Sequence, residues 1–212
     1  MNNLKSRLAR EKRFKFYGIA SITLALSLLS LLFVSIFSQG YTAFQETKVQ
    51  LYINFDQEIL DPNKTRDWEI IKRSNFNLLI KNSVSELFPD VKGRSKKRKL
   101  KKLISNSAEY QLRDYVKKNI SVIGTKKKIW VLADDDLDML IKGYINRILP
   151  ENERRIDNEE LKWIEILEEK NLIKKFFNKT FFTSGDSSES EQSGILGAFV
   201  GSLFALSITL VL

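Results

Sequence analysis

The sequence predicts a membrane protein in which two transmembrane α-helices flank a mixed α/β extracytoplasmic domain. Two observations predict the helices: residues 16–45 and residues 192–212 contain no charged side chain, although 29% of the 212 residues are charged. A third predicts the domain, because the apolar residues between these runs recur with the period of a strand in some segments and of a helix in others. Buried helices of a soluble core are the alternative for both runs, but such helices seldom need so long an apolar stretch.

The first membrane helix is predicted over residues 17–38. Residues 18–37 read GIASITLALSLLSLLFVSIF, and twenty residues at about 1.5 Å each cover the roughly 30 Å of a bilayer's hydrocarbon core. The run is longer than the about 7 to 15 apolar residues of a cleaved secretory signal. We therefore expect an uncleaved signal anchor.

The charges beside this helix predict its orientation. Residues 1–16 form a basic N-terminus with a single acidic residue, Glu11, whereas Lys48 is the only cation between residues 37 and 63. Segments beside a membrane helix that are rich in lysine and arginine tend to remain in the cytoplasm. This rule predicts a cytoplasmic N-terminus and places the α/β domain, residues 39–182, on the other side of the membrane. The cations in question are Lys5, Arg7, Arg10, Lys12, Arg13 and Lys15.

The first half of the predicted domain holds one strand and two helices. Residues 47–56 alternate between apolar and polar side chains, as a half-buried strand does. Residues 68–88 predict a helix that Pro89 ends, because proline cannot continue it. Residues 95–118 carry one apolar stripe at helical spacing, which predicts a single long amphipathic helix.

The second half of the domain holds another strand and two more helices. Residues 128–133 form a short apolar run typical of a buried strand. Residues 137–148 predict a helix that a proline ends. Residues 156–170 predict a further helix, in which Asp157 and Glu160 have the spacing of a capping box.

The chain then reaches a polar linker, residues 183–193 with the sequence TSGDSSESEQS, and the second predicted transmembrane helix, residues 194–212. Small residues at four-residue spacing let membrane helices approach closely. They predict a packing site for a partner helix along one side of this span. The apolar run stops without a flanking charge, from which we expect a truncated chain. The packing residues are Gly194, Gly197, Ala198, Gly201 and Ser202.

Composition excludes several kinds of chemistry. The chain has no cysteine and no histidine, so it can form neither a disulfide framework nor a zinc finger, and it has no Ser-His-Asp or Cys-His pair. The sequence therefore predicts no catalytic residue, no cofactor and no metal site, and we expect no enzyme activity.

Two charged clusters allow more than one interpretation. Residues 92–102, KGRSKKRKLKK, are most simply the solvated face of an amphipathic helix, with an anion-attracting collar or a nucleic-acid surface as alternatives. Stacking aromatics are missing there, so we expect no nucleic-acid partner. Residues 134–138, DDDLD, follow a predicted strand, where acidic residues cap a helix start. Calcium or magnesium binding is the alternative.

Five segments resemble one known family. They read REKRFKFYG, SQGYTAF, WVLADDDLDMLIKG, LPENERRI and FFNKTFFTSGDSSESEQSGILGAFVGS. In this order, over nearly the whole chain, they resemble the N-terminal portion of the PstA-type permease of bacterial phosphate ABC transporters. The resemblance is to the variant that carries an extra exported domain between its first two spans. Residues 130–143 and 181–202 are the most specific blocks.

The resemblance implies a permease subunit of an ATP-driven phosphate importer in the bacterial inner membrane, with residues about 39–193 periplasmic. It implies as partners membrane lipid, a PstC-type permease subunit, cytoplasmic ATPase subunits that hydrolyse the ATP, and a periplasmic phosphate-binding protein. Residues 194–212 would then begin the permease core that forms the translocation path. The exported domain would dock the binding protein or steady the open side of the permease. The alternative is a membrane-anchored structural or signalling domain with no transport role.

Overall fold

The structure, a computed structural model, describes residues 2–187 and 192–211 and divides into two units, Met1–Thr42 and Ala43–Leu212. The first unit consists of helix α1 (Asn2–Gly40) and the start of the 3-10 turn η1 (Tyr41–Phe44). Among the described residues, Arg10–Phe44 is the one helical stretch that is long and apolar enough to cross a bilayer by length and composition, and an 18-residue window within it has a mean hydropathy of 2.4.

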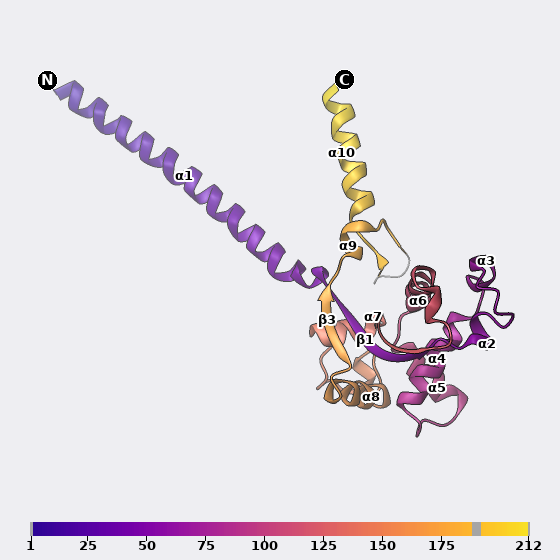
Figure 1. The fold of residues 1–212 in the computed structure, drawn as a ribbon. Coiled ribbons are helices and arrows are strands. Elements are labelled where there is room, and N and C mark those ends of the chain that lie inside the picture. Colours follow the sequence, from indigo (N-terminus) through magenta and orange to yellow (C-terminus); the bar gives the residue numbers. More distant parts are fainter. Residues whose placement is uncertain (1, 188–191, 212) are drawn as a thin grey trace. The chain divides into compact units, whose positions relative to one another are not determined.

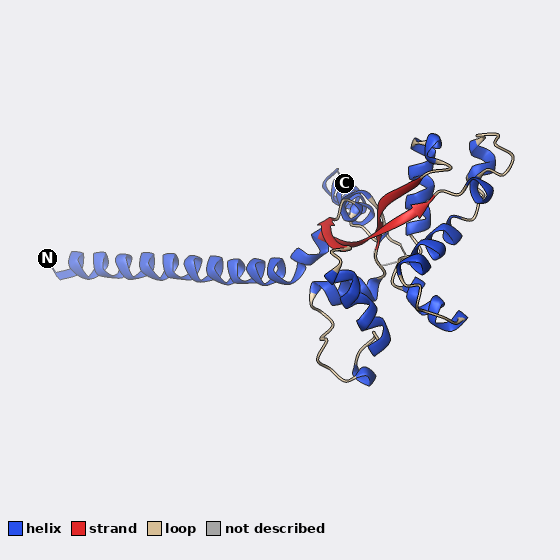
Figure 2. Cartoon of the chain, turned by 60° about the horizontal axis from the view of Figure 1, so that its bottom comes forward, coloured by secondary structure: helices blue, strands red, loops and turns tan. Residues whose placement is uncertain are grey.

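The second unit is built on a three-stranded antiparallel sheet with the order β2-β1-β3, drawn in red in Figure 2. The strands are β1 (Gln45–Asn54), β2 (Lys126–Leu132) and β3 (Ile173–Phe177). Val49 of the central strand is opposite Val131 on one side and Ile173 on the other. The sheet therefore joins the beginning, middle and end of the domain.

Helices and 3-10 turns make up most of the remaining domain. Figure 1 shows α9 directly after the end of β3, followed by α10. The helices are α2 (Gln57–Leu60), α3 (Trp68–Ile71), α4 (Phe76–Leu87), α5 (Arg94–Lys102), α6 (Ala108–Lys118), α7 (Asp135–Lys142), α8 (Asn158–Glu169), α9 (Thr180–Thr183) and α10 (Leu196–Val211), and the turns are η2 (Ile120–Val122) and η3 (Glu151–Glu153).

One face of the sheet carries the core. Val49, Leu51 and Ile53 alternate along β1 and are at most 1% exposed. Burying each such side chain stabilises the fold by about 1.5 to 3 kcal/mol. They join one cluster of buried side chains with residues from the helices, among them Val84 of α4, Leu100 of α5, Leu112 of α6, Leu137 of α7 and Leu167 of α8. Helices α4 to α8 therefore cover this face of the sheet.

Both predicted strands are confirmed to within two residues at each end, and one strand was missed. β3 has only five residues, with two lysines among three apolar side chains, and so short a mixed segment carries no clear period. The second predicted span stays a prediction. In the described part of the chain, its helix is α10, Leu196–Val211.

The predicted helices over residues 68–88 and 95–118 are each wrong as single helices. The first breaks into α3 and α4 because Asn75 caps a new helix by accepting a hydrogen bond from the Leu78 N–H at 2.9 Å. The second breaks because residues 103–105 pair with the end of β2: the Ser105 N–H donates to the Leu132 carbonyl at 3.1 Å. Periodicity cannot detect such breaks when the apolar stripe continues across them.

The predicted helix over residues 137–148 is also wrong at its C-terminal end. α7 ends at Lys142, well before Pro150, because Gly143 adopts a left-handed conformation with φ of 88°. The Tyr144 N–H then donates to the Met139 carbonyl at 2.9 Å. This is the usual way in which glycine ends a helix.

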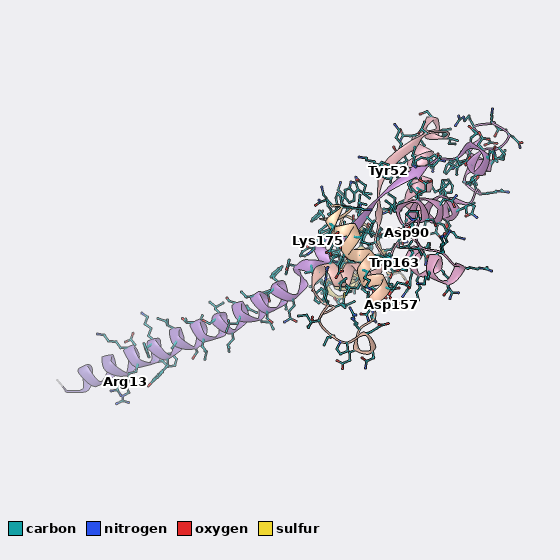
Figure 3. The ribbon with its side chains drawn as sticks, turned by 90° about the horizontal axis from the view of Figure 1, so that it is seen from below. Arg13, Tyr52, Asp90, Asp157, Trp163 and Lys175 are labelled. Atoms are coloured by element: carbon teal, nitrogen blue, oxygen red, sulfur yellow. The ribbon has the colours of Figure 1, made fainter. Side chains whose placement is uncertain are left out.

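The capping box at the start of α8 is confirmed. Asp157 accepts a hydrogen bond from the Glu160 N–H at 2.8 Å, and the Glu160 carboxylate accepts one from the Asp157 N–H at 3.0 Å. Asp157 and Trp163 are labelled on this helix in Figure 3. Burial raises the pKa of Asp157, but the hydrogen bond from Lys99 and those from backbone N–H groups outweigh it and hold the pKa below its ordinary value.

We predict that Asp157→Ala lowers the free energy of unfolding of the domain by about 1 kcal/mol, the usual cost of losing a helix cap. Lys162→Ala is the matched control, because Lys162 is exposed on the same helix. Denaturant unfolding of the detergent-solubilised chain, followed by tryptophan fluorescence, measures both. Equal midpoints for the two variants would contradict a stabilising cap.

A buried carboxylate organises the loop that follows α2. Asp61 is fully buried and accepts hydrogen bonds from the Thr65 N–H at 2.9 Å, the Thr65 hydroxyl at 3.1 Å and the Arg66 N–H at 2.9 Å. Lys64 and Arg66 have φ values of 56° and 54°, a strained conformation for side chains of this kind. Burial raises the pKa of Asp61, but these hydrogen bonds outweigh it and leave the pKa below its ordinary value.

We predict that Asp61 makes the domain acid-sensitive. Because its pKa is lower in the folded state, its contribution is complete well above about pH 4 and is lost as the pH falls through the folded pKa. Asp61→Asn should therefore lower stability at neutral pH and weaken the further loss on acidification. Denaturant midpoints across this pH range measure the effect. Asp114→Asn, an exposed position on α6, should leave both unchanged, and an acid response identical in all three proteins would refute the prediction.

Candidate interaction surface

The predicted packing residues of the second span divide into two groups. Gly194 precedes α10, whereas Gly197, Ala198, Gly201 and Ser202 lie on it. A Cβ at Gly194 would lie 2.3 Å from the Ser184 carbonyl oxygen, so this glycine is needed for a backbone contact inside the domain. Its packing against a partner helix stays a prediction. A Cβ at Gly201 meets nothing within 4 Å, and the packing role of the α10 residues stays a prediction.

The chain enters and leaves the domain at one place, which we call the domain base and define as Phe44, Phe177, Asn178, Phe181 and Phe182. The Asn178 N–H donates to the Phe44 carbonyl at 2.9 Å. The ring of Phe44 lies 5.5 Å from that of Phe181 and is stacked on that of Phe182 at 5.7 Å between centroids. Phe177 stacks on Phe182 at 5.6 Å. Hydrogen bonds and ring contacts therefore join the start of β1 to the segment after β3.

The domain base also holds the start of the second apolar helix. The Ile195 N–H donates to the Phe181 carbonyl at 2.8 Å, and the Leu196 N–H donates to the Ser184 carbonyl at 3.1 Å. Residues 45–177 therefore form a domain whose two ends are adjacent, with an apolar segment on either side. Adjacent ends are what an insertion between two consecutive chain segments requires.

The basic segment 92–102 is largely the helix α5, and its cations face acidic helix starts. Lys96 pairs with Glu159, and Lys99 pairs with Asp157, at the N-terminus of α8. Lys102 pairs with Asp136 of α7 at 3.3 Å. These hydrogen bonds raise the pKa of Lys99 and of Lys102. The predicted solvated helix face therefore also has a structural role, because it neutralises two acidic helix N-termini.

The acidic segment 134–138 caps α7, as predicted. Asp134 is the N-cap residue and accepts from the Asp136 N–H at 3.4 Å, while Asp138 accepts from the Thr47 N–H at 3.0 Å and holds α7 against β1. Arg155 lies 3.7 Å from Asp135 and 3.4 Å from Asp136. Within residues 2–187 and 192–211, no group of three or more acidic side chains is arranged to hold a metal ion.

The second face of the sheet carries a different set of side chains. We call it the lysine–aromatic face and define it as Lys48, Tyr52, Lys128, Trp130, Lys174 and Phe176. These residues share a face because Tyr52 is opposite Lys128, Gln50 is opposite Trp130, and Lys48 is opposite Lys174. They alternate with the buried positions Val49, Leu51 and Ile53. Figure 3 labels Tyr52, which belongs to this face, on β1. It also labels Lys175 of β3, which is opposite Thr47 near the start of β1.

Each lysine of this face lies over an aromatic ring of another strand. The Lys48 Nζ is 5.3 Å from the Phe176 centroid, the Lys174 Nζ is 5.6 Å from the Trp130 centroid, and the Lys128 Nζ is 5.1 Å from the Tyr52 centroid. Each such contact is worth about 0.5 to 1 kcal/mol at an exposed site. Trp130 and Phe176 meet edge to face at 5.2 Å. The rings therefore hold three ammonium groups in place on one surface.

The face has an excess of positive charge. Lys48 pairs with Glu46 at 2.7 Å. Neither Lys128 nor Lys174 forms an ion pair with a carboxylate in the described part of the chain, and both are exposed. Ordered cations beside exposed rings attract anionic groups that also offer an apolar neighbour. The arrangement can bind a charged surface, but it offers no nucleophile paired with a base.

Sequence reasoning found only part of this face. The alternation of residues 47–56 predicts a polar side that includes Lys48 and Tyr52, but β2 was interpreted as a buried strand and β3 was not predicted. The available signal was the alternation of Lys126, Lys128 and Trp130, which begins before the apolar run. Extending that strand by two residues would have revealed its polar face.

Comparison with known proteins gives one match. The profile of the family described as Domain of unknown function (DUF3333) matches residues 1–151. This range includes the whole of α1 and the first two strands, β1 and β2. No curated protein and no solved structure matches the chain.

We predict that Gly194→Ala destabilises the connection between the domain base and α10, since the new methyl group would meet the Ser184, Thr180 and Phe181 carbonyl oxygens at 2.3, 2.8 and 2.9 Å. Forcing atoms into such a site costs about 1 to 3 kcal/mol. Limited proteolysis between residues 180 and 195 should accelerate. The control variant on α10, Gly201→Ala, should be cleaved at the rate of the unmodified chain. Equal cleavage rates for the two variants would contradict the close approach of Gly194 to these carbonyl oxygens.

Proposed function

The chain belongs to the DUF3333 family, whose function its description leaves open, and we propose that it forms the N-terminal part of the membrane permease subunit of an ATP-driven phosphate importer. A second permease subunit would complete the translocation path, and separate cytoplasmic subunits would hydrolyse the ATP. Transport would proceed by alternating access, in which the second apolar helix moves against its neighbours.

One observation carries the architectural part of this proposal. The domain base joins Phe44 to Asn178 and Phe181 to Ile195 by hydrogen bonds of 2.9 and 2.8 Å. The long apolar helix before the domain and the apolar helix after it therefore connect to the same end of the domain. This is the geometry expected of a domain inserted between two consecutive membrane helices, with the polar part on one side of the membrane.

Charge and sequence likeness support the remaining parts. The basic residues in the first turns of α1, ahead of its apolar part, favour a cytoplasmic N-terminus, and hence an exported domain. The substrate, phosphate, follows from the likeness of residues 130–143 and 181–202 to PstA-type permeases, since no described residue is assigned to the anion. The exported position also suits a domain that docks a substrate-binding protein or steadies the open side of the permease.

A second candidate is a structural or signalling domain held by a membrane anchor. Among the described helices, the stretch that contains α1 is the one long and apolar enough to cross a bilayer, and one such helix is sufficient to anchor a domain. Transport measurements separate the two candidates, since a tethered domain predicts unchanged phosphate uptake.

We predict that the domain is labelled from outside the cell. The chain has no cysteine, so single cysteines at Ser6 and at the exposed Lys97 can be labelled selectively. A membrane-impermeant maleimide should label Lys97→Cys in intact spheroplasts and Ser6→Cys only after permeabilisation. In the same cells, disrupting the gene that carries this chain should abolish ATP-dependent phosphate uptake, with restoration by the unmodified gene as control. Reversed labelling would refute the topology, and normal uptake after disruption would refute the transport role.

A further inference from the structure

We propose that the lysine–aromatic face docks on the anionic headgroups of the membrane that anchors the chain. The inference rests on the proposed function only for the membrane anchor and the exported position of the domain. It assigns to the sheet a ligand class, acidic phospholipid, that neither the resemblance nor the family description assigns.

Charge is the first step of the argument. The face presents Lys48, Lys128 and Lys174 on three adjacent strands, and Glu46 is its one carboxylate, already paired with Lys48. Ring contacts fix the ammonium groups of Lys128 and Lys174 without neutralising them. Electrostatic attraction stabilises a basic residue near an anionic membrane surface by about 1 kcal/mol. Two or three lysines on one face therefore stabilise docking by about 2 to 3 kcal/mol.

Position along the chain is the second step. β1 begins at Gln45, directly after the long apolar helical stretch that ends at Phe44. Lys48 lies three residues into this strand, about 10 Å from its start at 3.3 Å per residue. Lys174 is opposite Lys48 on β3, whose last residue, Phe177, belongs to the domain base. The face therefore begins within reach of the membrane surface and is held there by covalent connections.

The choice of side chains favours lipid over a protein partner. Protein interfaces are enriched in arginine and depleted in lysine, whereas every cation of this face is a lysine. Lysine has a long apolar stem with a compact charge at its end, and such side chains extend toward headgroups at membrane interfaces. Trp130 and Tyr52 are of the aromatic types that concentrate at the same depth. The combination of lysine, tryptophan and tyrosine is thus typical of a membrane-interface surface.

Tryptophan fluorescence of the full chain in vesicles tests the proposal. The chain is reconstituted into vesicles of phosphatidylcholine alone, or of phosphatidylcholine and phosphatidylglycerol in equal parts. In each, a fraction of the lipid carries a spin label at the headgroup, which quenches nearby indoles. The difference between the unmodified chain and Trp130→Phe isolates Trp130 from Trp68 and Trp163. We expect strong quenching of Trp130 in the vesicles with phosphatidylglycerol and weak quenching in those without it.

Matched charge variants identify the cause. The double variant Lys128→Gln with Lys174→Gln should lower the ratio of docked to undocked chains by about 25-fold, since each lysine raises the docking equilibrium constant roughly fivefold. Lys92→Gln with Lys97→Gln removes the same charge from exposed positions outside the face and should leave the quenching unchanged. Far-ultraviolet circular dichroism of each variant reports whether the domain remains folded.

Each outcome has a separate meaning. A chain that does not float with either vesicle overturns the membrane anchor and, with it, the proposed function. A chain that floats with both but shows equal Trp130 quenching with and without phosphatidylglycerol overturns the lipid proposal alone. The lipid proposal is also overturned if the two double variants lose Trp130 quenching equally, because the loss would then depend on the net charge of the chain and not on this face. In either of these last two cases, an acidic protein surface becomes the partner class that fits the exposed lysines.

Discussion

The antiparallel pairing of β1 with β3 is the constraint on which the rest of the domain depends. Because β3 runs back toward the start of β1, the chain leaves the domain where it entered, and Asn178 reaches Phe44. A parallel third strand would end near Asn54, about 30 Å away at the rise of a ten-residue strand. The two apolar segments would then lie at opposite ends of the sheet, and a long connection would be needed to return the second one to the same membrane surface.

The cations of the domain are held in two different ways. Three cations of α5, Lys96, Lys99 and Lys102, pair with carboxylates at the starts of α7 and α8, and the Lys99–Asp157 pair stabilises the N-terminus of α8. The lysines of the sheet are matched by aromatic rings, which position an ammonium group without cancelling its charge. Part of the dense run of lysines in the sequence is therefore structural, whereas the scattered lysines of three strands form a surface that is available to an anionic partner.

Local signals in the sequence predicted the local features of this fold, and tertiary contacts decided the rest. The alternation around Val49, the capping box at Asp157 and the acidic cap at Asp134 depend on neighbouring residues only, and each is confirmed. The break at Ser105 depends on the Leu132 carbonyl, 27 positions away, and the need for glycine at residue 194 depends on the Ser184 carbonyl. The lysine–aromatic face could not be assembled from the sequence because it requires the register of β3, a strand too short to show its own period.

On the proposed function, the contacts around Gly194 would couple the domain to the second apolar helix. Hydrogen bonds from Ile195 to Phe181 of the domain base and from Leu196 to Ser184 restrict the connection between the base and the start of α10, so a displacement of that helix would be transmitted to the sheet. A sheet that rests on lipid would resist the displacement by only about 1 kcal/mol for each docked lysine. Such a contact is strong enough to bias the resting position of the second apolar helix and weak enough to be broken and remade in each transport cycle. On the proposed function, the domain would therefore support the open side of the permease through a contact whose strength increases with the number of docked lysines.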